Sequence, residues 1–237
     1  MSVPRAMIRS RAFLTAVCLL LLAPLIHGDD GDLIANDPGA LQRRGIEHFF
    51  AGRIKEALAD WDRVIALAPE QGPYHWQRGI ALYYAGKYEL GVAQFESHQA
   101  VNRNDVENAA WHFLCVVRSK DGSVELARKQ LIPIKGDTRV PMKEVHQLFA
   151  GTGTPEAVLA TARAGAEGAA LRNQLCYAHL YLGLYFEALG QDDKAALHMK
   201  KAAVDYKMDH YMGMVARLHH KLRGEHPSLK TAYPRKS

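Results

Sequence analysis

Apolar residues are arranged in two different ways along this chain. Near the amino terminus they form one long run, from Ala12 to Ile26, whereas between about residues 38 and 223 they recur at spacings of three and four. Such spacing places apolar side chains on one face of an α-helix. No stretch alternates apolar and polar residues over the length of a strand, so the pattern predicts an all-α fold.

The amino-terminal run has the layout of a secretory signal peptide. Arginines and no acidic residue precede the run, and an acidic stretch, Asp29 to Asp32, follows it. The run is shorter than the about 20 apolar residues that span a bilayer, and Pro24 interrupts it. We therefore predict a signal peptide over residues 1–28, a short polar lead over 29–37, and an exported protein in the periplasm or outside the cell. The alternative is an uncleaved membrane anchor.

The remaining pattern repeats itself. Arg44-Gly45-Ile46 recurs as Arg78-Gly79-Ile80, and Ala51-Gly52 recurs as Ala85-Gly86, in both cases 34 positions later. At the same spacing Trp61 matches Phe95. A period of 34 residues with a helix–turn–helix pattern is the signature of the tetratricopeptide repeat.

The spacing has a physical basis. Glycine at positions 45 and 79 lets the first helix of a unit press closely on the second. Gly52 and Gly86 suit the left-handed conformation that follows a helix end. Trp61 and Phe95 fill the groove to the next unit, and Pro69 ends the first unit because it cannot continue a helix.

Later units depart from the strict period. Gly122 follows Gly86 after 36 residues, which predicts a two-residue insertion near residues 102–105. Farther on, Pro141 and Thr154-Pro155 predict helix starts, and Gly151 predicts a helix end. The predicted units are 38–71, 72–105, 108–140, a degenerate 142–175 and 176–209, then a closing helix 210–223 ended by Gly224 and a flexible tail 224–237. Residues 38–223 would then form one superhelix of antiparallel helix pairs.

Charge argues against a nucleic-acid partner. The formal net charge is +5 and the pI is about 9.1. The predicted signal peptide carries three arginines and no acidic residue, so its removal lowers the net charge to +2. Lys230, Arg235 and Lys236 in the tail leave a mild attraction to an anionic surface, and hence peripheral membrane association.

No familiar catalytic motif occurs in the sequence. HExxH, GxSxG, the phosphate-binding GxxxxGK[ST] and a complete GxGxxG are all missing, so we predict neither enzymatic activity nor a cofactor. Cys115 and Cys176 are predicted to be buried free thiols, with Cys176 at the start of a helix. The alternative is a small metal-binding or hydrolytic protein that uses histidines. We expect His48, His75 and His112 to line the groove instead, and the histidines of the last helix, His210, His219 and His220, to be solvated.

First helices of stacked repeats line the concave face of a superhelix and build an extended groove. Tyrosine and tryptophan are favoured binding residues because they combine apolar area with a polar tip. Adjacent Tyr83 and Tyr84 cannot share one helix face, so at least one should point into the groove or solvent. We predict no metal site, and a peptide or protein partner bound by a groove formed from Gln42, Ile46, Phe49, Phe50, Trp76, Ile80, Tyr83, Tyr84, His112, Val116, Leu180, Leu184 and Glu187.

One family resemblance covers roughly residues 38–220. Residues 72–105, GPYHWQRGIALYYAGKYELGVAQFESHQAVNRND, resemble a unit of the NlpI-type periplasmic repeat lipoproteins, and a decayed middle followed by YLGLYFEALGQDDKAALHMKKAA is similar too. The resemblance implies an adaptor that binds cell-wall hydrolases and a tail-specific protease and forms homodimers. Val17 before Cys18 is not the small residue of a lipobox, so the resemblance does not extend to lipid anchoring.

Overall fold

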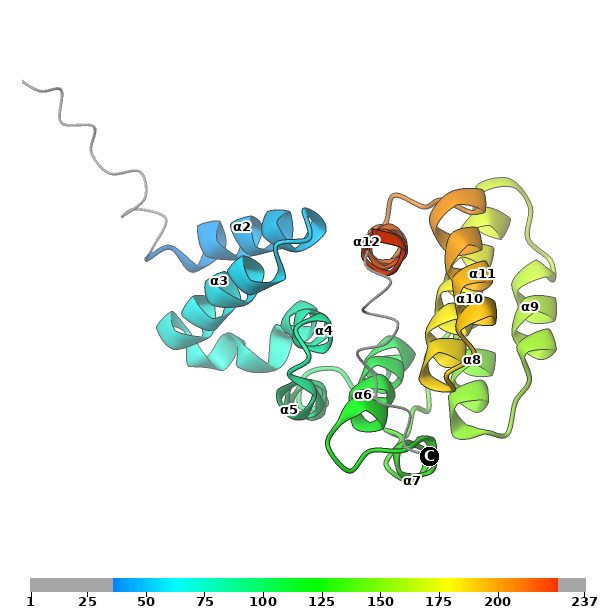
Figure 1. The fold of residues 1–237 in the computed structure, drawn as a ribbon, viewed down its shortest axis with the longest axis horizontal. Coiled ribbons are helices and arrows are strands. Elements are labelled where there is room, and N and C mark those ends of the chain that lie inside the picture. The colour runs from blue at the N-terminus through cyan, green and yellow to red at the C-terminus, as the bar shows by residue number, and fades with distance from the viewer. Residues whose placement is uncertain (1–35, 226–237) are drawn as a thin grey trace, which may run out of the picture.

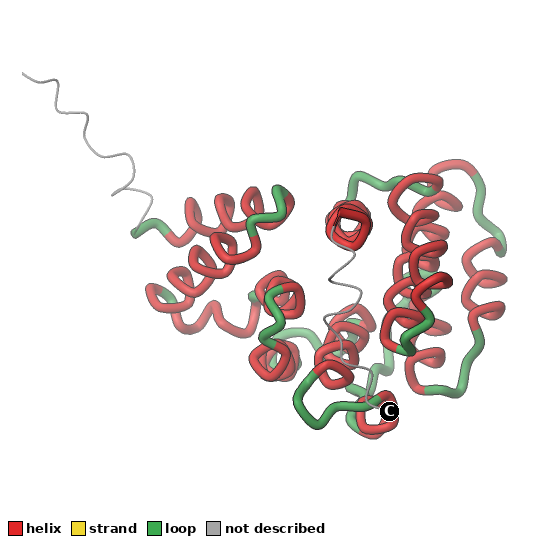
Figure 2. Tube along the Cα trace, in the orientation of Figure 1, coloured by secondary structure: helices red, strands yellow, loops and turns green. Residues whose placement is uncertain are grey.

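The computed structural model describes residues 36–225 (Figure 1). The predicted signal peptide, and most of the lead and the tail, lie outside the described residues. Within them the chain folds into helices joined by turns and loops, without a strand (Figure 2). The prediction of an all-α fold is confirmed.

Most of the helices are short and follow one another after brief connections. In chain order they are α2 (Pro38–Phe50), α3 (Ile54–Leu67), the 3-10 helix η1 (Pro69–Tyr74), α4 (Trp76–Tyr84), α5 (Tyr88–His98), α6 (Val106–Arg118), α7 (Val124–Lys129), α8 (Met142–Ala150), α9 (Pro155–Arg163), α10 (Gly168–Ala188), α11 (Asp192–Lys200), the π-helix η2 (Lys201–Asp205) and α12 (Tyr211–Glu225). None of the helices between residues 36 and 225 is both long enough and apolar enough to cross a membrane.

Side-chain caps start several of these helices where the sequence indicates. Thr154 accepts a hydrogen bond from the Ala157 amide, and Pro155 occupies the first turn of α9. Gly151 ends α8 in the left-handed conformation, with φ of 79°. Both predictions in the degenerate segment are therefore confirmed. Asp105 caps α6 in the same way by accepting a hydrogen bond from the Glu107 amide at 3.0 Å.

Close approach at two glycines joins the first helix of a pair to the second. A Cβ atom on Gly45 would lie 2.5 Å from Nε1 of Trp61, and one on Gly79 would lie 2.6 Å from Cζ of Phe95. No real Cβ comes so near another atom, so only glycine permits this packing. The ring lies 16 positions after the glycine in both pairs, as the repeat predicts. The turn glycines, Gly52 and Gly86, adopt the predicted positive φ.

Three boundaries differ from the sequence expectation. Gly122 was expected to match the turn glycines, but its φ is not positive. Helix α10 already begins at Gly168, so Cys176 lies in its middle and not at its start, because good helix formers precede the cysteine. Helix α12 continues through Gly224, where the sequence predicts its end. One glycine costs a helix only about 1 kcal/mol, so it need not terminate it.

Helix α12, the last among the described helices, lies between the amino-terminal helices and the pair α10 and α11 (Figure 1). Figure 1 shows α12 end-on near the centre of the molecule, with α2 and α4 on one side and α10 on the other. One continuous apolar core runs through the molecule, and it includes Trp61, Trp111 and Tyr181 together with Val215 of α12. We call the surface of α2, α4, α6 and α10 that faces α12 the inner face.

Candidate functional site

Aromatic side chains hold the start of α12 on the inner face. The ring of Tyr211 meets those of Phe50 and Trp76 edge-to-face, with centroids 4.8 Å apart in both cases. It also stacks on Phe49 at 6.4 Å. Aromatic pairs in this range add to the free energy of area burial. The aromatic residues of the first two units, predicted to line an open groove, therefore contact a helix of their own chain.

A buried carboxylate holds the other end of α12. Glu187 of α10 is 7% exposed and accepts hydrogen bonds from the Tyr83 hydroxyl at 2.8 Å and from Nη2 of Arg223 at 2.6 Å. Nε2 of His219 lies 2.7 Å from its second oxygen, and Nδ1 of His219 lies 3.0 Å from the Tyr84 hydroxyl. We call these five residues the Glu187 cluster.

Electrostatics favours the charged form of this carboxylate. Burial alone would raise the pKa of Glu187, but His219 and Arg223 hold it well below its usual range. The carboxylate therefore stays ionised in the interior and is compensated chiefly by groups on α12. Removing one partner from a buried ion pair is strongly destabilising, because the other charge then remains buried without compensation.

The predicted groove residues divide by exposure. Five are half-buried, namely Gln42, Ile46, Phe50, Trp76 and Tyr84. Eight are buried within the chain, namely Phe49, Ile80, Tyr83, His112, Val116, Leu180, Leu184 and Glu187. The structure therefore differs from the expectation of a groove open along four units, because helices of the same chain, α12 among them, cover these residues. Partner binding by the set stays a prediction.

The sequence predicts that at least one of the adjacent tyrosines points into the groove or solvent, and Tyr84 lies on the inner face, where α12 covers it. Tyr83 is buried and bonds Glu187 of α10, whereas Tyr84 is half-buried and contacts His219 of α12. Their side chains reach the same cluster because α10 and α12 both approach α4.

An open cleft remains at the start of α12. It measures about 210 Å³ and lies between α4, α5, α6, the loop before α8 and the first residues of α12. Trp76 and Ile80 of the predicted groove line it, together with Trp111, Tyr211 and several polar side chains. Cleft residues that the sequence did not single out include Glu107, Asn108 and Arg139.

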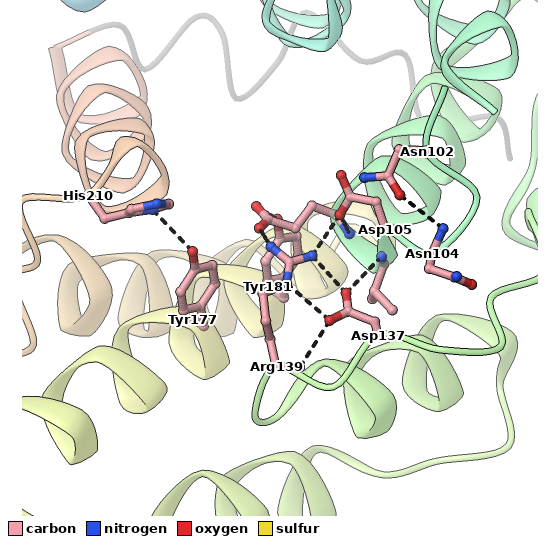
Figure 3. A network of polar contacts seen from close by, with 10 residues as sticks. Asn102, Asn104, Asp105, Asp137, Arg139, Tyr177, Tyr181 and His210 are labelled. Carbon is pink, nitrogen blue, oxygen red and sulfur yellow. Dashed lines mark hydrogen bonds and ion pairs between the residues drawn. The ribbon is translucent and has the colours of Figure 1, made fainter. Parts of the chain in front are cut away.

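Three carboxylates surround one guanidinium group beside this cleft (Figure 3). Arg139 contacts Asp105 and Asp137, at 2.7 Å in each case, and also Glu107. The Tyr181 hydroxyl donates to the other oxygen of Glu107 at 2.7 Å. Burial raises the pKa of the Glu107 carboxyl to about 7, although Arg139 opposes this effect. We call these five residues the Arg139 cluster.

The histidines expected in the groove face elsewhere. Nε2 of His48 lies 3.7 Å from Asp60 of α3, and Nε2 of His112 lies 3.6 Å from Glu96 of α5. Both side chains therefore point toward second helices. His75 is buried just before α4 begins. The expectation of a solvated His219 is wrong, because this side chain is buried against Glu187.

One histidine pair escaped the sequence analysis. Nδ1 of His179 lies 2.8 Å from Nδ1 of His198, and the His179 ring stacks on Tyr206. Burial, together with the neighbouring His198 and Lys201, lowers the pKa of His179 to about 3. Among the residues that the structure describes, no three histidine, cysteine or acidic side chains are grouped to hold a metal ion.

Both described cysteines are buried and free, as predicted. Burial raises the pKa of the Cys115 thiol far above its usual range and that of Cys176 to about 11. Thiols that stay protonated are weak nucleophiles. They therefore serve packing, and Sγ of Cys115 fills the space beside Gly91.

No protein-family model matches the sequence.

Proposed function

We propose that this protein is an exported tetratricopeptide-repeat adaptor, similar to the NlpI-type periplasmic lipoproteins, without catalytic activity of its own. It binds a peptide or protein partner on the inner face and links a protease or a cell-wall hydrolase to envelope substrates. A homodimer and peripheral membrane association belong to the same proposal.

The repeated contacts support the tetratricopeptide assignment. Besides the two glycine–ring pairs, the arginine before each glycine reaches the second helix of its pair. Arg44 donates to Asp60 at 2.9 Å, and Arg78 donates to Gln94 at 3.0 Å. These partners are again 16 positions apart, so two successive units use one packing scheme.

The observation that carries the proposal is that the inner face already binds a helix. It holds α12 through Tyr211, which packs among aromatic rings, and through His219 and Arg223, which pair with Glu187. Aromatic anchors and charged partners of this kind are how grooves bind helical segments. Beside α12 the cleft leaves Trp76 accessible to a second segment.

Affinity capture from an envelope extract tests the proposal. The full chain is compared with Trp76→Ala, Tyr84→Ala and a control, Leu90→Ala, whose leucine lies on α5 and is 51% exposed. Truncating an aromatic anchor at an interface costs about 2 kcal/mol, or about thirtyfold in affinity. We expect Trp76→Ala to lose the captured partner and Leu90→Ala to keep it.

Two results would contradict the adaptor. One is a captured partner that neither Trp76→Ala nor Tyr84→Ala weakens while both variants keep the helical circular dichroism spectrum. The other is stoichiometric zinc or copper after mild purification, which would favour the histidine-based alternative.

A further inference from the structure

The cleft at the start of α12 has aromatic walls and a polar mouth. Trp76 and Tyr211 line it with their rings in contact, and Trp111 lines it from α6. Arg139, whose side chain is 42% exposed, connects the cleft to solvent. Its volume of about 210 Å³ exceeds the about 150 Å³ that accommodates benzene in an engineered cavity. A ligand of the size of one amino-acid side chain fits.

The cleft carries an excess of negative charge. Asp105, Glu107 and Asp137 share the single guanidinium group of Arg139, so one or two negative charges remain, depending on whether Glu107 is protonated. Asp105 and Glu107 line the cleft itself. His210 is the other lining group that can become positive, and its ring lies 3.1 Å from the Tyr177 hydroxyl (Figure 3). Negative charge beside aromatic rings attracts cations.

Unpartnered polar atoms point to a ligand independently of the charge. Asn108 lines the cleft at 2% exposure; its amide nitrogen donates to the Phe95 carbonyl at 3.0 Å, but Oδ1 has no partner. Nε1 of Trp111, a residue that is 1% exposed, is also unpartnered. Buried polar groups normally have hydrogen-bond partners. The cleft thus offers an acceptor at Asn108 and a donor at Trp111.

We infer that this cleft binds the cationic side chain of a lysine or arginine residue. The charged nitrogen donates to Asp105 and Asn108, and the methylene groups lie along Trp76 and Tyr211. An anionic ligand would be repelled by the carboxylates, and an apolar ligand would leave Asn108 unpaired. The inference rests on the proposed function in one respect, namely that the cationic side chain belongs to the partner segment.

A titration of the full chain with small probes tests the cleft without a partner. Arginine amide is compared with citrulline amide, its neutral isostere, and lysine amide with norleucine amide, by isothermal titration calorimetry. We expect each cation to bind about tenfold more tightly than its neutral counterpart, and the difference to shrink as salt is added.

Two matched variants locate the effect. Asp105→Asn keeps a residue that caps helices well and removes the charge, so we expect cation affinity to fall about tenfold. Asp121→Asn removes an exposed carboxylate just beyond the other end of α6, about 20 Å along the helix, and should change nothing.

Equal binding of charged and neutral probes, no saturable binding of either cation, or unchanged affinity in a folded Asp105→Asn variant would overturn the inference. If Asp105→Asn does not fold, the salt dependence of the wild-type titration decides alone. If partner capture fails while arginine amide still binds, the result contradicts the proposed adaptor function but not the inferred cation site in the cleft.

Discussion

Removing the charge of Glu187 should loosen α12 from the inner face. In Glu187→Gln the shape of the side chain is kept, but His219 and Arg223 lose their counter-ion. The carboxylate is 7% exposed and faces two groups on α12, the His219 ring at 2.7 Å and the Arg223 guanidinium group at 2.6 Å. Removing one partner of a buried ion pair costs about 3–5 kcal/mol. We expect about 3 kcal/mol for the amide, because it still accepts one hydrogen bond.

Thermal unfolding and hydrogen exchange measure this effect. A loss of about 3 kcal/mol lowers the melting temperature of a chain of this size by about 6–12 °C. Exchange should accelerate first in the amides of α12, while those of α2 and α3 keep their protection until global unfolding. Leu90→Ala provides the control for a substitution outside the inner face.

The pH dependence has a defined sign. The pKa of Glu187 is lower in the folded chain than in the unfolded one, so its contribution is present above the unfolded value of about 4.5 and is lost as pH falls below it. The difference between wild type and Glu187→Gln should therefore shrink in acid. A loss below about 1 kcal/mol at neutral pH, or uniform acceleration of exchange along the chain, would refute this account of α12.

Three other predictions follow from buried groups and close contacts. Because the pKa of Glu107 is raised to about 7, its contribution to stability is present below about pH 4.5 and is lost as pH rises through 7. Glu107→Gln should remove that loss of stability. Parallel stability–pH curves for wild type and Glu107→Gln would contradict this prediction. Gly79→Ala should cost about 1–3 kcal/mol through overpacking, whereas Gly224→Ala, in open space inside α12, should stabilise by up to about 1 kcal/mol; chemical denaturation checks both. With Cys18 replaced by serine, Cys115 and Cys176 should react with a thiol reagent only after unfolding, and rapid labelling of the native chain would show the burial to be wrong.

The helix pairs were predictable because their contacts are local. Gly45 contacts Trp61 and Gly79 contacts Phe95 across only 16 positions. The spacing of these residues in the sequence is therefore enough to predict how the two helices of a pair pack. The helix starts at Thr154 and Asp105 depend on hydrogen bonds two or three residues away, and such signals are equally short-ranged.

The site could not be predicted in this way. The bond from Tyr83 to Glu187 spans 104 positions, and the contact of Tyr84 with His219 spans 135. No periodicity links residues so far apart, so the packing of α12 on the inner face could not be predicted. The Arg139 cluster depends on the loop before α8, which the repeat pattern leaves undefined.

The position of α12 in the fold differs from its place in the order of synthesis. This helix is translated after every other described helix, yet it lies between α2 and α4 on one side and α10 on the other (Figure 1). A nascent chain that has reached residue 205 has made the whole inner face and lacks its cover, so Phe50, Trp76 and Tyr84 meet water or whatever binds aromatic surfaces. Domains form as their chain emerges. The inner face therefore cannot close before α12 has been synthesised, and until then a chaperone that recognises exposed aromatic rings can bind it.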